Sequence, residues 1–472
     1  MIQIENIKKV YFIGIGGIGM SAIARYFHAR GIEVSGYDKT PTQLTKTLEQ
    51  SGINIIHEEH VGLIPKDVQL VVFTPAVPAA HAALLYYRQN GYQVLKRSEV
   101  LELISKSSFN ICVAGTHGKT TITAMIAHIL RHSGFGCNAF LGGIATNYNT
   151  NFWSDPNNVC VIEADEYDRS FLRLNPDIAI ISSMDPDHLD IYGTEQTLQQ
   201  AFIDFSKKVK QGGMLLTIFG LKRGREMKAD ELLTYSLQNE AADVNASNIQ
   251  IMSGSYVFNV MLKGSILDRV VLNMGGMHNV ENVVAAITVA HRLGISGDKI
   301  KAAVEAFAGV KRRFEYIVKT GTDKEGIIYI DDYAHHPEEL KALITGARTL
   351  FKQRTCTVVF QPHLFTRTRD LASAFAESLD LADTVILLPV YPARELPIEG
   401  ISSNTIAERM QNKHVHVITK EELLPFLQNR FLTRANQEYG ELLITAGAGD
   451  IDQLVEPLKK IIQQNEHIND VQ

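Results

Sequence analysis

The sequence predicts an α/β protein of three domains, and two observations lead to this. At 472 residues the chain is longer than one hydrophobic core usually supports, so two or three domains are expected. Three segments, which open near residues 8, 109 and 327, each begin with an apolar strand that runs into a glycine-rich or polar loop and then a helical pattern. Strands that alternate with helices are typical of doubly wound sheets.

The composition is that of a soluble globular protein, with 45% hydrophobic and 21% charged residues. No polybasic stretch indicates a nucleic-acid or membrane partner, and no window approaches the roughly 20 uninterrupted apolar residues of a spanning helix. The N-terminus has no signal-peptide pattern. The cysteines form no Cys-x-x-Cys pair and are expected as buried thiols: Cys112, Cys137, Cys160 and Cys356. We expect a cytoplasmic protein, a monomer or weak homodimer, that acts on small molecules.

The first strand runs into a glycine-rich turn, in which Gly14, Gly16 and Gly19 have the G-x-G-x-x-G spacing. Glycines at these positions let the backbone approach a pyrophosphate. A helix and a second strand are predicted over residues 20–37. The strand ends at Asp38, near the distance at which an acidic residue meets a nucleotide ribose in such folds. The ligand stays open, because these glycines also suit an NAD-dependent oxidoreductase or a tight turn without a ligand.

A phosphate-binding loop, GTHGKTT, follows a predicted strand over residues 109–114 and precedes a helix. Its backbone N–H groups are expected to face an anion, with Lys119 reaching the β and γ phosphates and Thr120 holding Mg²⁺. The general G-x-x-x-x-G-K-[ST] motif is not met, because Val113 stands where its first glycine belongs. The loop residues are Gly115, Thr116, His117, Gly118, Lys119, Thr120 and Thr121.

Two later strands end in acidic loops, EADE and DPDHLD. Ligands of open α/β sheets gather at the carboxyl ends of the strands, so these loops are expected to face the same crevice as Lys119. The candidates are Glu163, Asp165, Glu166, Asp185, Asp187 and His188. Glu163 and His188 are expected to bind Mg²⁺ or Mn²⁺ rather than zinc. Glu166 and Asp190 are expected to be solvated charges or helix caps.

A polar cluster, GGMHNVEN, opens the next helix. Asn279 and Asn282 are candidates to bind adenine through their amides. Asn279 also suits the N-cap of that helix, and the two roles are compatible.

The last segment is predicted to be a doubly wound sheet. Its strands are expected near residues 327–330, 357–360, 384–388, 415–418 and 442–445. Pro337 is expected in the first turn of a helix. His335 and His336 suggest zinc, but adjacent residues cannot easily share one metal and no third ligand has suitable spacing. Of Arg367 and Arg369, which could clamp a carboxylate or phosphate, Arg367 is expected in the site and Arg369 in solvent.

The motifs occur in an order that resembles the Mur ligases, which build the peptide stem of bacterial cell-wall precursors. They are GIGGIGMSAIA, AGTHGKTT, EADE, DPDHLDIYG, GMHNVENVVAA, GVKRRFE, DDYAHHP, FQPHLFTRTRD and ITAGAGDI, and they cover residues 8 to about 452. The resemblance implies a Rossmann-like UDP-sugar-binding domain over residues 1–106, a P-loop-type central ATP-binding domain over 107–313 and a doubly wound, Rossmann-like C-terminal ligase domain over 314–472.

Within the family, the motifs favour the member that uses ATP and Mg²⁺ to join L-alanine to UDP-N-acetylmuramate. The resemblance assigns the UDP sugar to Gly14, Gly16, Gly17, Gly19 and Asp38. It assigns ATP to the phosphate loop with Asn279, Asn282, Arg313 and Asp332. The implied metal ligands are Thr120, Glu163 and His188. The implied catalytic residues are Lys119, Glu163, His188, Arg313, His335 and Arg367.

Three departures and three rivals accompany this expectation. Residues 198–205 lack the lysine that is carbamylated in later ligases of the pathway, which favours the first one. Leu364 stands where many members have Arg, and Arg394 departs from the usual YxAGE, so details of substrate contact stay open.

The rivals are a recycling ligase that attaches L-Ala-γ-D-Glu-meso-diaminopimelate to the same nucleotide, an NAD-dependent oxidoreductase and a nucleotide-regulated binding protein.

Overall fold

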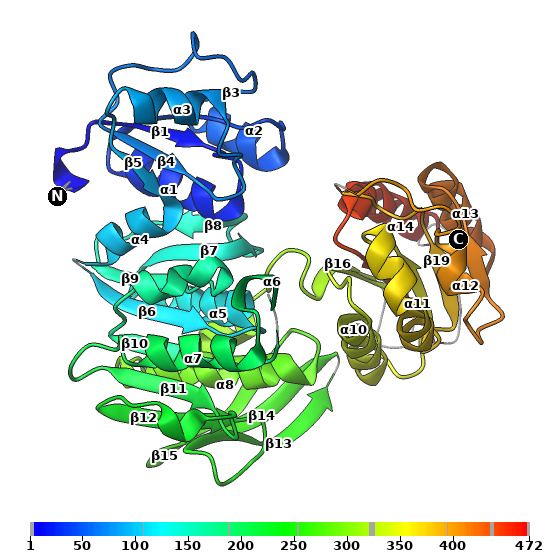
Figure 1. Ribbon diagram of the computed structural model, residues 1–472. Coiled ribbons are helices and arrows are strands. Elements are labelled where there is room, and N and C mark those ends of the chain that lie inside the picture. The colour runs from blue at the N-terminus through cyan, green and yellow to red at the C-terminus, as the bar shows by residue number, and fades with distance from the viewer. Residues whose placement is uncertain are drawn as a thin grey trace. The chain divides into compact units, whose positions relative to one another are not determined.

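The computed structural model describes residues 4–106, 108–186, 189–252, 254–320, 326–393, 395–434 and 439–469. Its strands form three sheets, and the α/β class predicted from the sequence is confirmed (Figure 1). Two compact units contain them. The first comprises Met1–Asn248, Phe258–Val270 and Glu281–Phe307, and the second comprises Ile249–Val257, Val271–Val280 and Ala308–Gln472.

The first sheet has five parallel strands in the order β3-β2-β1-β4-β5. They are β1 (Lys9–Ile13), β2 (Glu33–Tyr37), β3 (Asn54–Ile56), β4 (Leu70–Phe73) and β5 (Val94–Lys96). The helices are α1 (Ile18–Ala29), α2 (Gln43–Gln50), α3 (Ala82–Gln89) and α4 (Arg97–Ser105). Because α1 begins directly after Gly17, its first turn faces the glycine-rich turn, as predicted for a βαβ unit.

The second sheet has ten strands in the order β15-β14-β13-β12-β11-β10-β6-β9-β7-β8. Its centre is β6 (Phe109–Ala114), which is parallel to β9 (Val159–Glu163) and β10 (Ile178–Ile181). Strands β7 (Asn138–Ala145) and β8 (Thr150–Trp153) form an antiparallel edge. The remaining strands are β11 (Met214–Ile218), β12 (Glu231–Ser236), β13 (Val244–Met252), β14 (Ser255–Leu262) and β15 (Ser265–Leu272).

Helices on this sheet carry or support the polar loops. They are α5 (Lys119–His132), η2 (Tyr167–Arg173), α6 (Leu189–Tyr192), α7 (Glu195–Ser206), α8 (Met277–Arg292) and α9 (Gly297–Ala306). Phe171 of η2 packs on Phe202 and Phe205 of α7, with ring centroids 5.2 and 5.0 Å apart. This buried aromatic stack supports the acidic loop that joins β9 to η2.

Helix α1 joins the first sheet to the second (Figure 1). Tyr26 contacts the rings of Phe140 on β7 and Phe152 on β8, at centroid distances of 5.5 and 6.2 Å. The buried amide of Asn151 donates hydrogen bonds to the Ile18 carbonyl at 2.6 Å and to Ser21 Oγ at 3.0 Å. The glycine-rich turn is therefore fixed against the sheet that carries the phosphate loop.

The third sheet lies in the second unit and has the order β16-β17-β21-β18-β19-β20. Strand β16 (Glu315–Lys319) is antiparallel to β17 (Ile327–Asp332). The parallel strands β18 (Thr355–Phe360), β19 (Thr384–Leu387), β20 (Val415–Val417) and β21 (Glu441–Ala446) match the predicted positions, whereas β16 was not predicted. The helices are α10 (Pro337–Leu350), α11 (Phe365–Leu379), α12 (Asn404–Ala407), α13 (Lys420–Arg434) and α14 (Val455–Asn469). Pro337 begins α10, as predicted.

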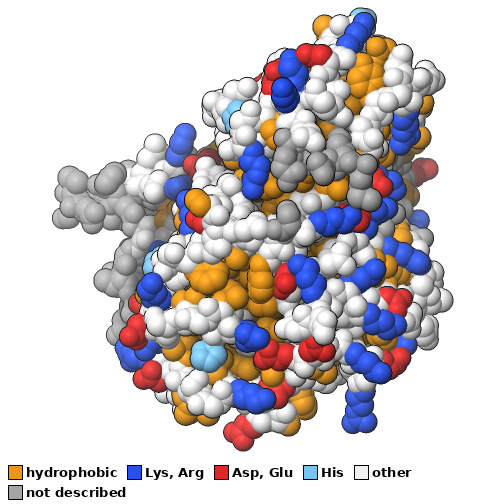
Figure 2. Space-filling view, turned by 90° about the vertical axis from the view of Figure 1, so that its left-hand side faces the viewer, with side chains coloured by type: hydrophobic (Ala, Val, Ile, Leu, Met, Phe, Trp, Pro, Cys, Tyr) orange, Lys and Arg blue, Asp and Glu red, His pale blue; other side chains and the backbone are white. Residues whose placement is uncertain are grey.

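Acidic and basic side chains are interspersed on the face shown in Figure 2, without a wide field of one sign. All four cysteines are buried and free, as expected. Among the described helices, none is long and apolar enough to cross a membrane.

The buried imidazole of His128 predicts a pH dependence of stability. Its Nε2 donates to the Ala303 carbonyl at 2.9 Å and its Nδ1 accepts from the Tyr148 hydroxyl at 2.9 Å, which suits a neutral ring. Burial lowers the pKa of His128 to about 4. The free energy of unfolding is thus highest above the ordinary pKa near 6.5. It falls by on the order of 3 kcal/mol as the pH falls from there toward 4, because the unfolded chain binds the proton first.

We expect the urea concentration at the midpoint of unfolding to decrease less between pH 7.5 and pH 5 in His128→Gln than in the wild type. His291→Gln, a change at an exposed histidine of α8, is the control and is expected to keep the wild-type pH dependence. An unchanged pH dependence in His128→Gln would contradict this account.

Candidate active site

The loop between β6 and α5 has the conformation of a phosphate-binding turn. Gly115 and Gly118 have φ values of 138° and 78°, which other residue types rarely adopt. A Cβ on Gly115 would lie 2.1 Å from Ser182 Oγ, so the loop also needs glycine for close packing. The N-terminus of α5 follows Gly118 directly and has no side-chain cap, so its first N–H groups suit an anion.

Lys119 lies beneath this loop and pairs with a buried carboxylate. Its Nζ donates to the Gly115 carbonyl at 2.6 Å and to Glu166 Oε1 at 2.8 Å. Glu166 is fully buried and provides no side-chain cap to η2, so the expectation of a solvated charge or cap was wrong. Burial raises the pKa of Glu166 and the Lys119 ammonium opposes this, and the 2.8 Å contact is that of an ion pair.

Thr120 and Glu163, two of the predicted metal ligands, are in direct contact. Thr120 Oγ1 donates to Glu163 Oε1 at 2.9 Å, and the Gly142 N–H donates to Glu163 Oε2 at 2.9 Å. His188 and Asp187 lie outside the described residues, as does the side chain of Asp190. Among the described side chains, no group of three or more His, Cys, Asp or Glu residues could hold a metal ion.

Two serines at the end of β10 hold the phosphate loop in place. Ser183 Oγ accepts a hydrogen bond from the His117 N–H at 2.7 Å and lies 2.9 Å from Thr116 Oγ1. Ser182 Oγ donates to the His117 carbonyl. Asp185 is largely exposed, with its carboxylate 3.7 Å from the His117 ring. These serines therefore fix the loop, and Asp185 extends into solvent beside it.

The glycine-rich turn is closed by Asp38. Gly14 has a φ of 84°, and the Gly16 N–H donates to Asp38 Oδ2 at 2.7 Å. The Thr40 N–H donates to Asp38 Oδ1 at 3.1 Å. A Cβ on Gly16 would lie 2.7 Å from the same carboxylate. Asp38 thus holds the turn through Oδ2 and the segment that follows it through Oδ1.

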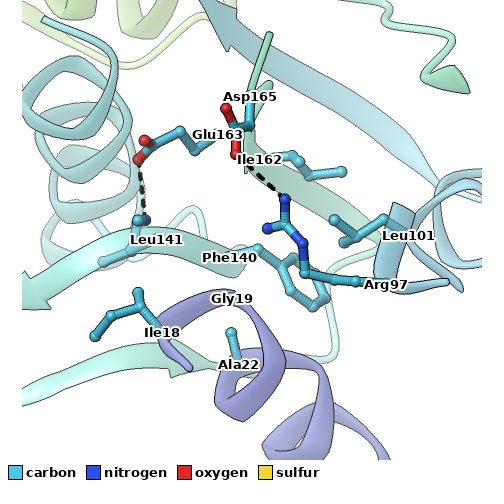
Figure 3. Close-up of a pocket in the computed structure, with 11 residues that line it drawn as sticks. Ile18, Gly19, Ala22, Arg97, Leu101, Phe140, Leu141, Ile162, Glu163 and Asp165 are labelled. Carbon is cyan, nitrogen blue, oxygen red and sulfur yellow. Dashed lines mark hydrogen bonds and ion pairs between the residues drawn. The ribbon is translucent and has the colours of Figure 1, made fainter. Parts of the chain in front are cut away.

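A cavity of about 200 Å³ lies between the glycine-rich turn and the end of β9 (Figure 3). Apolar side chains from α1, α4 and β7 form much of its wall. Its polar groups are Arg97, Glu163 and Asp165, with Arg97 Nη2 3.3 Å from Asp165 Oδ2. The cavity connects the start of α1, where Gly19 is predicted to bind pyrophosphate, with Glu163, which is predicted to bind metal.

Asn282 lies beside the phosphate loop, whereas Asn279 is bonded to the backbone just before its own helix. A Cβ on Gly118 would lie 2.8 Å from Asn282 Oδ1, so the Asn282 amide lies against the phosphate loop. Asn279 is the third residue of α8, and its amide donates to the Gly275 carbonyl at 2.6 Å. It is therefore not the N-cap that was expected.

In the second unit, Asp332 ties two segments together. Its carboxylate accepts the Phe314 N–H at 2.6 Å and the Ala334 N–H at 2.7 Å, and burial raises its pKa to about 6. The neighbouring Arg312 pairs with buried Asp331 at 3.2 Å, whereas Arg313 is exposed. Asp332 consequently orders the GVKRRFE segment and the start of the DDYAHHP loop.

The second unit also gathers His335, His363, Arg367 and Tyr391. The His335 ring is 6.0 Å from the His363 ring, which stacks on Tyr391 at 5.7 Å. His363 Nδ1 and Arg367 Nη1 are buried and have no hydrogen-bond partner among the described residues. Burial, and then the Arg367 charge, lower the pKa of His363. Buried donors without a partner are unfavourable, so this group suits a small anionic ligand.

Leu364 and Arg369 bear on the same group. Leu364 has a φ of 70° and its N–H donates to the Tyr391 carbonyl at 2.9 Å. Its side chain cannot donate to an anion as the more common Arg would. Arg369 is exposed and bonds to Asp370 at 2.7 Å, as expected. Arg394 lies outside the described residues.

Sequence reasoning missed four residues of these arrangements, Arg97, Ser182, Ser183 and His363. Ser182 and Ser183 were not singled out, because serine at the end of a strand is common. Arg97 had no motif signal, since its position depends on the packing of α4 near β9. His363 stood in the FQPH motif, which was the one signal available.

Three family models match consecutive parts of the chain. They are the Mur ligase family, catalytic domain, over residues 9–108, the Mur ligase middle domain over residues 113–290, and the Mur ligase, glutamate ligase domain, over residues 312–449.

Individual proteins match over nearly the whole length. A UDP-N-acetylmuramate–L-alanine ligase of Flavobacterium johnsoniae is 45% identical over 470 residues, which cover 98% of this chain and 100% of the relative. A relative of the same name from Porphyromonas gingivalis is 44% identical, with 97% and 99% covered. The crystal structure of a UDP-N-acetylmuramate–alanine ligase from Thermotoga maritima matches with a TM-score of 0.81 at 27% identity, over 98% of this chain and 100% of that chain. With three consecutive family models and full-length relatives at this identity, the chain belongs to the Mur ligase family.

Proposed function

We propose that this protein joins L-alanine to the lactyl carboxylate of UDP-N-acetylmuramate, with conversion of ATP to ADP and phosphate, in the synthesis of peptidoglycan precursors. The observation that carries the proposal is the cavity that leads from the glycine-rich turn to Glu163, next to Thr120 and Lys119. A nucleotide sugar with its diphosphate at the turn would extend toward the phosphate loop. The names of the full-length relatives support L-alanine as the amino acid.

The phosphate loop fits ATP with Mg²⁺. Gly115 and Gly118 allow the backbone N–H groups and the N-terminus of α5 to approach phosphate oxygens. Thr120 and Glu163 offer hard oxygen ligands of the kind that Mg²⁺ prefers, and His188 is proposed as a further ligand. A metal ion bound there would offset negative charge on the phosphates. Asn282, which lies beside Gly118, is proposed to contact the nucleotide, as are Asn279, Arg313 and Asp332.

The reaction requires that the lactyl carboxylate is activated, because a carboxylate and an amine do not condense in water. The carboxylate oxygen attacks the γ-phosphorus of ATP, the bond to the β–γ bridging oxygen breaks, and ADP leaves. Lys119 moves from Glu166 to the transferring group and offsets its charge. The amine of L-alanine then attacks the acyl carbon. The bond between the acyl carbon and the phosphate oxygen breaks, phosphate leaves, and the amine proton passes to solvent. His335 and Arg367 hold the carboxylate of L-alanine.

We place the domain boundaries near residues 106 and 313 and the protein in the cytoplasm, where its nucleotide substrates are made. The ranges of the three family models support these boundaries. The oxidoreductase interpretation loses its support, because a hydride-transfer enzyme would have no use for the phosphate loop and because the chain belongs to a ligase family.

The function is tested by phosphate release from Mg·ATP and UDP-N-acetylmuramate, with either L-alanine or the tripeptide L-Ala-γ-D-Glu-meso-diaminopimelate. We expect release that depends on L-alanine. Release with the tripeptide alone would assign the recycling reaction instead, and no release with either would reject the ligase proposal.

Replacement of the phosphate-loop lysine is expected to abolish turnover. Lys119→Ala removes the cation from the transferring group, and we expect L-alanine-dependent phosphate release to fall at least about 1000-fold, a loss of roughly 4 kcal/mol of transition-state stabilisation. Lys207→Ala, at an exposed lysine that pairs with Asp204, is the control and should keep wild-type activity. Substantial activity in Lys119→Ala would contradict this role.

Glu163→Gln is expected to change the metal requirement. The amide is a weaker ligand than the carboxylate, so the Mg²⁺ concentration that gives half-maximal activity should rise about tenfold or more. A Mg²⁺ titration at saturating ATP measures this. Glu226→Gln, which affects an exposed partner of Arg223, should leave the titration unchanged. A loss of activity in Glu163→Gln at every Mg²⁺ concentration, with an unshifted midpoint, would argue against a metal ligand.

Arg367 and Arg369 provide a matched pair for the amino-acid site. Arg367→Gln removes a buried donor, and the KM for L-alanine is expected to rise about tenfold or more while the KM for ATP stays within about twofold. Arg369→Gln removes an exposed arginine of the same helix, which is paired with Asp370, and should change neither KM. Equal effects of the two substitutions would refute the assignment of Arg367.

A further inference from the structure

Arg97 occupies an unusual position in the cavity next to the glycine-rich turn (Figure 3). It is the first residue of α4, and its guanidinium extends from the first sheet toward the end of β9. Nη2 lies 3.3 Å from Asp165 Oδ2, and a Cβ on Gly19 would lie 2.3 Å from Nη1. One guanidinium therefore contacts both the first turn of α1 and the acidic loop.

Arg97 is the residue whose charge would attract an anionic ligand to the cavity. Among the described residues that line the cavity, Arg97 is the one cation, and it faces the carboxylates of Glu163 and Asp165. These two carboxylates would repel a diphosphate. At the same end, the N-cap residue Gly17 provides no side-chain hydrogen bond to the first turn of α1. Ile18 and Gly19 of that turn line the cavity beside the guanidinium, and the first N–H groups of α1 have no side-chain cap there.

The contact between Arg97 and Asp165 is suited to exchange. The two side chains are 24% and 36% exposed, and ion pairs of this exposure contribute little to stability. Asp165 keeps other partners, because its Oδ1 accepts the Tyr167 N–H at 3.0 Å. If Arg97 were drawn to another anion, Asp165 would stay ordered and partly solvated at small cost.

We propose that Arg97 binds the diphosphate of the sugar nucleotide and gives up Asp165 to do so. The proposal rests on the proposed function, since it names the residue that recognises the diphosphate of that substrate. The planar guanidinium can donate two parallel hydrogen bonds to phosphate oxygens, which a lysine ammonium cannot do. In the free protein Asp165 competes with the substrate for the guanidinium.

Calorimetric titration of the full-length protein with UDP tests the proposal, because UDP carries the diphosphate without the lactyl carboxylate. We expect Arg97→Gln to weaken UDP binding about 10- to 100-fold, the range for a lost charge-assisted hydrogen bond. Arg97→Lys should recover only part of this loss. Asp165→Asn removes the competitor and is expected to tighten UDP binding a few fold. Opposite effects from the two partners of one ion pair cannot arise from a structural contact.

Several results would overturn the proposal. Equal UDP affinity of Arg97→Gln and wild type, or equal weakening by Arg97→Gln and Asp165→Asn, would show a structural role. Weakening for UDP-N-acetylmuramate but not for UDP would assign Arg97 to the lactyl carboxylate instead. Thermal unfolding without ligand checks that the variants fold. A wild-type protein that binds neither nucleotide would reject the proposed function itself, whereas wild-type binding with an unaffected Arg97→Gln rejects only this inference.

Discussion

The packing of α1 on β7 and β8 is the constraint on which the first site depends. Tyr26 lies against Phe140 and Phe152, and Asn151 holds the first turn of α1 through buried hydrogen bonds. Because the glycine-rich turn opens α1, this packing fixes its separation from the phosphate loop on the adjoining sheet. The cavity between them follows from the same packing, since Phe140, Ile18 and Ala22 form part of its wall. The proposed substrate, which would span the two loops, must therefore match this distance as well as the charges.

The EADE segment shows how the fold places three carboxylates beside a phosphate site. Each carboxylate has a different partner. Glu163 accepts from Thr120 and Gly142, Asp165 pairs with Arg97, and Glu166 pairs with Lys119. Two of these partners, Lys119 and Arg97, are cations that anionic substrates can recruit. The acidic segment therefore holds both cations in position in the free protein, and it contains Glu163, the proposed metal ligand.

Much of the fold could be predicted from the sequence, because apolar strands that end in glycine or acidic residues have a strong local signal. Strands β6, β17 and β21 were found in this way, strands β18 to β20 were found from their apolar runs alone, and the start of α10 was found from Pro337. Glu166 was misjudged because its burial depends on Lys119, 47 positions earlier in the chain, which no local pattern reports. Asn279 was misjudged because α8 begins two residues before it. Arg97 was missed because its role arises only where two sheets meet.

The account depends most on direct phosphorylation of a substrate carboxylate, and isotope transfer measures this step. UDP-N-acetylmuramate labelled with ¹⁸O in the lactyl carboxylate would be converted with ATP, Mg²⁺ and L-alanine, and the released phosphate would be analysed by mass spectrometry. The account predicts that one ¹⁸O atom per turnover appears in the phosphate, because the acyl–oxygen bond breaks when the amine attacks. Phosphate without ¹⁸O, formed together with the amide, would contradict it.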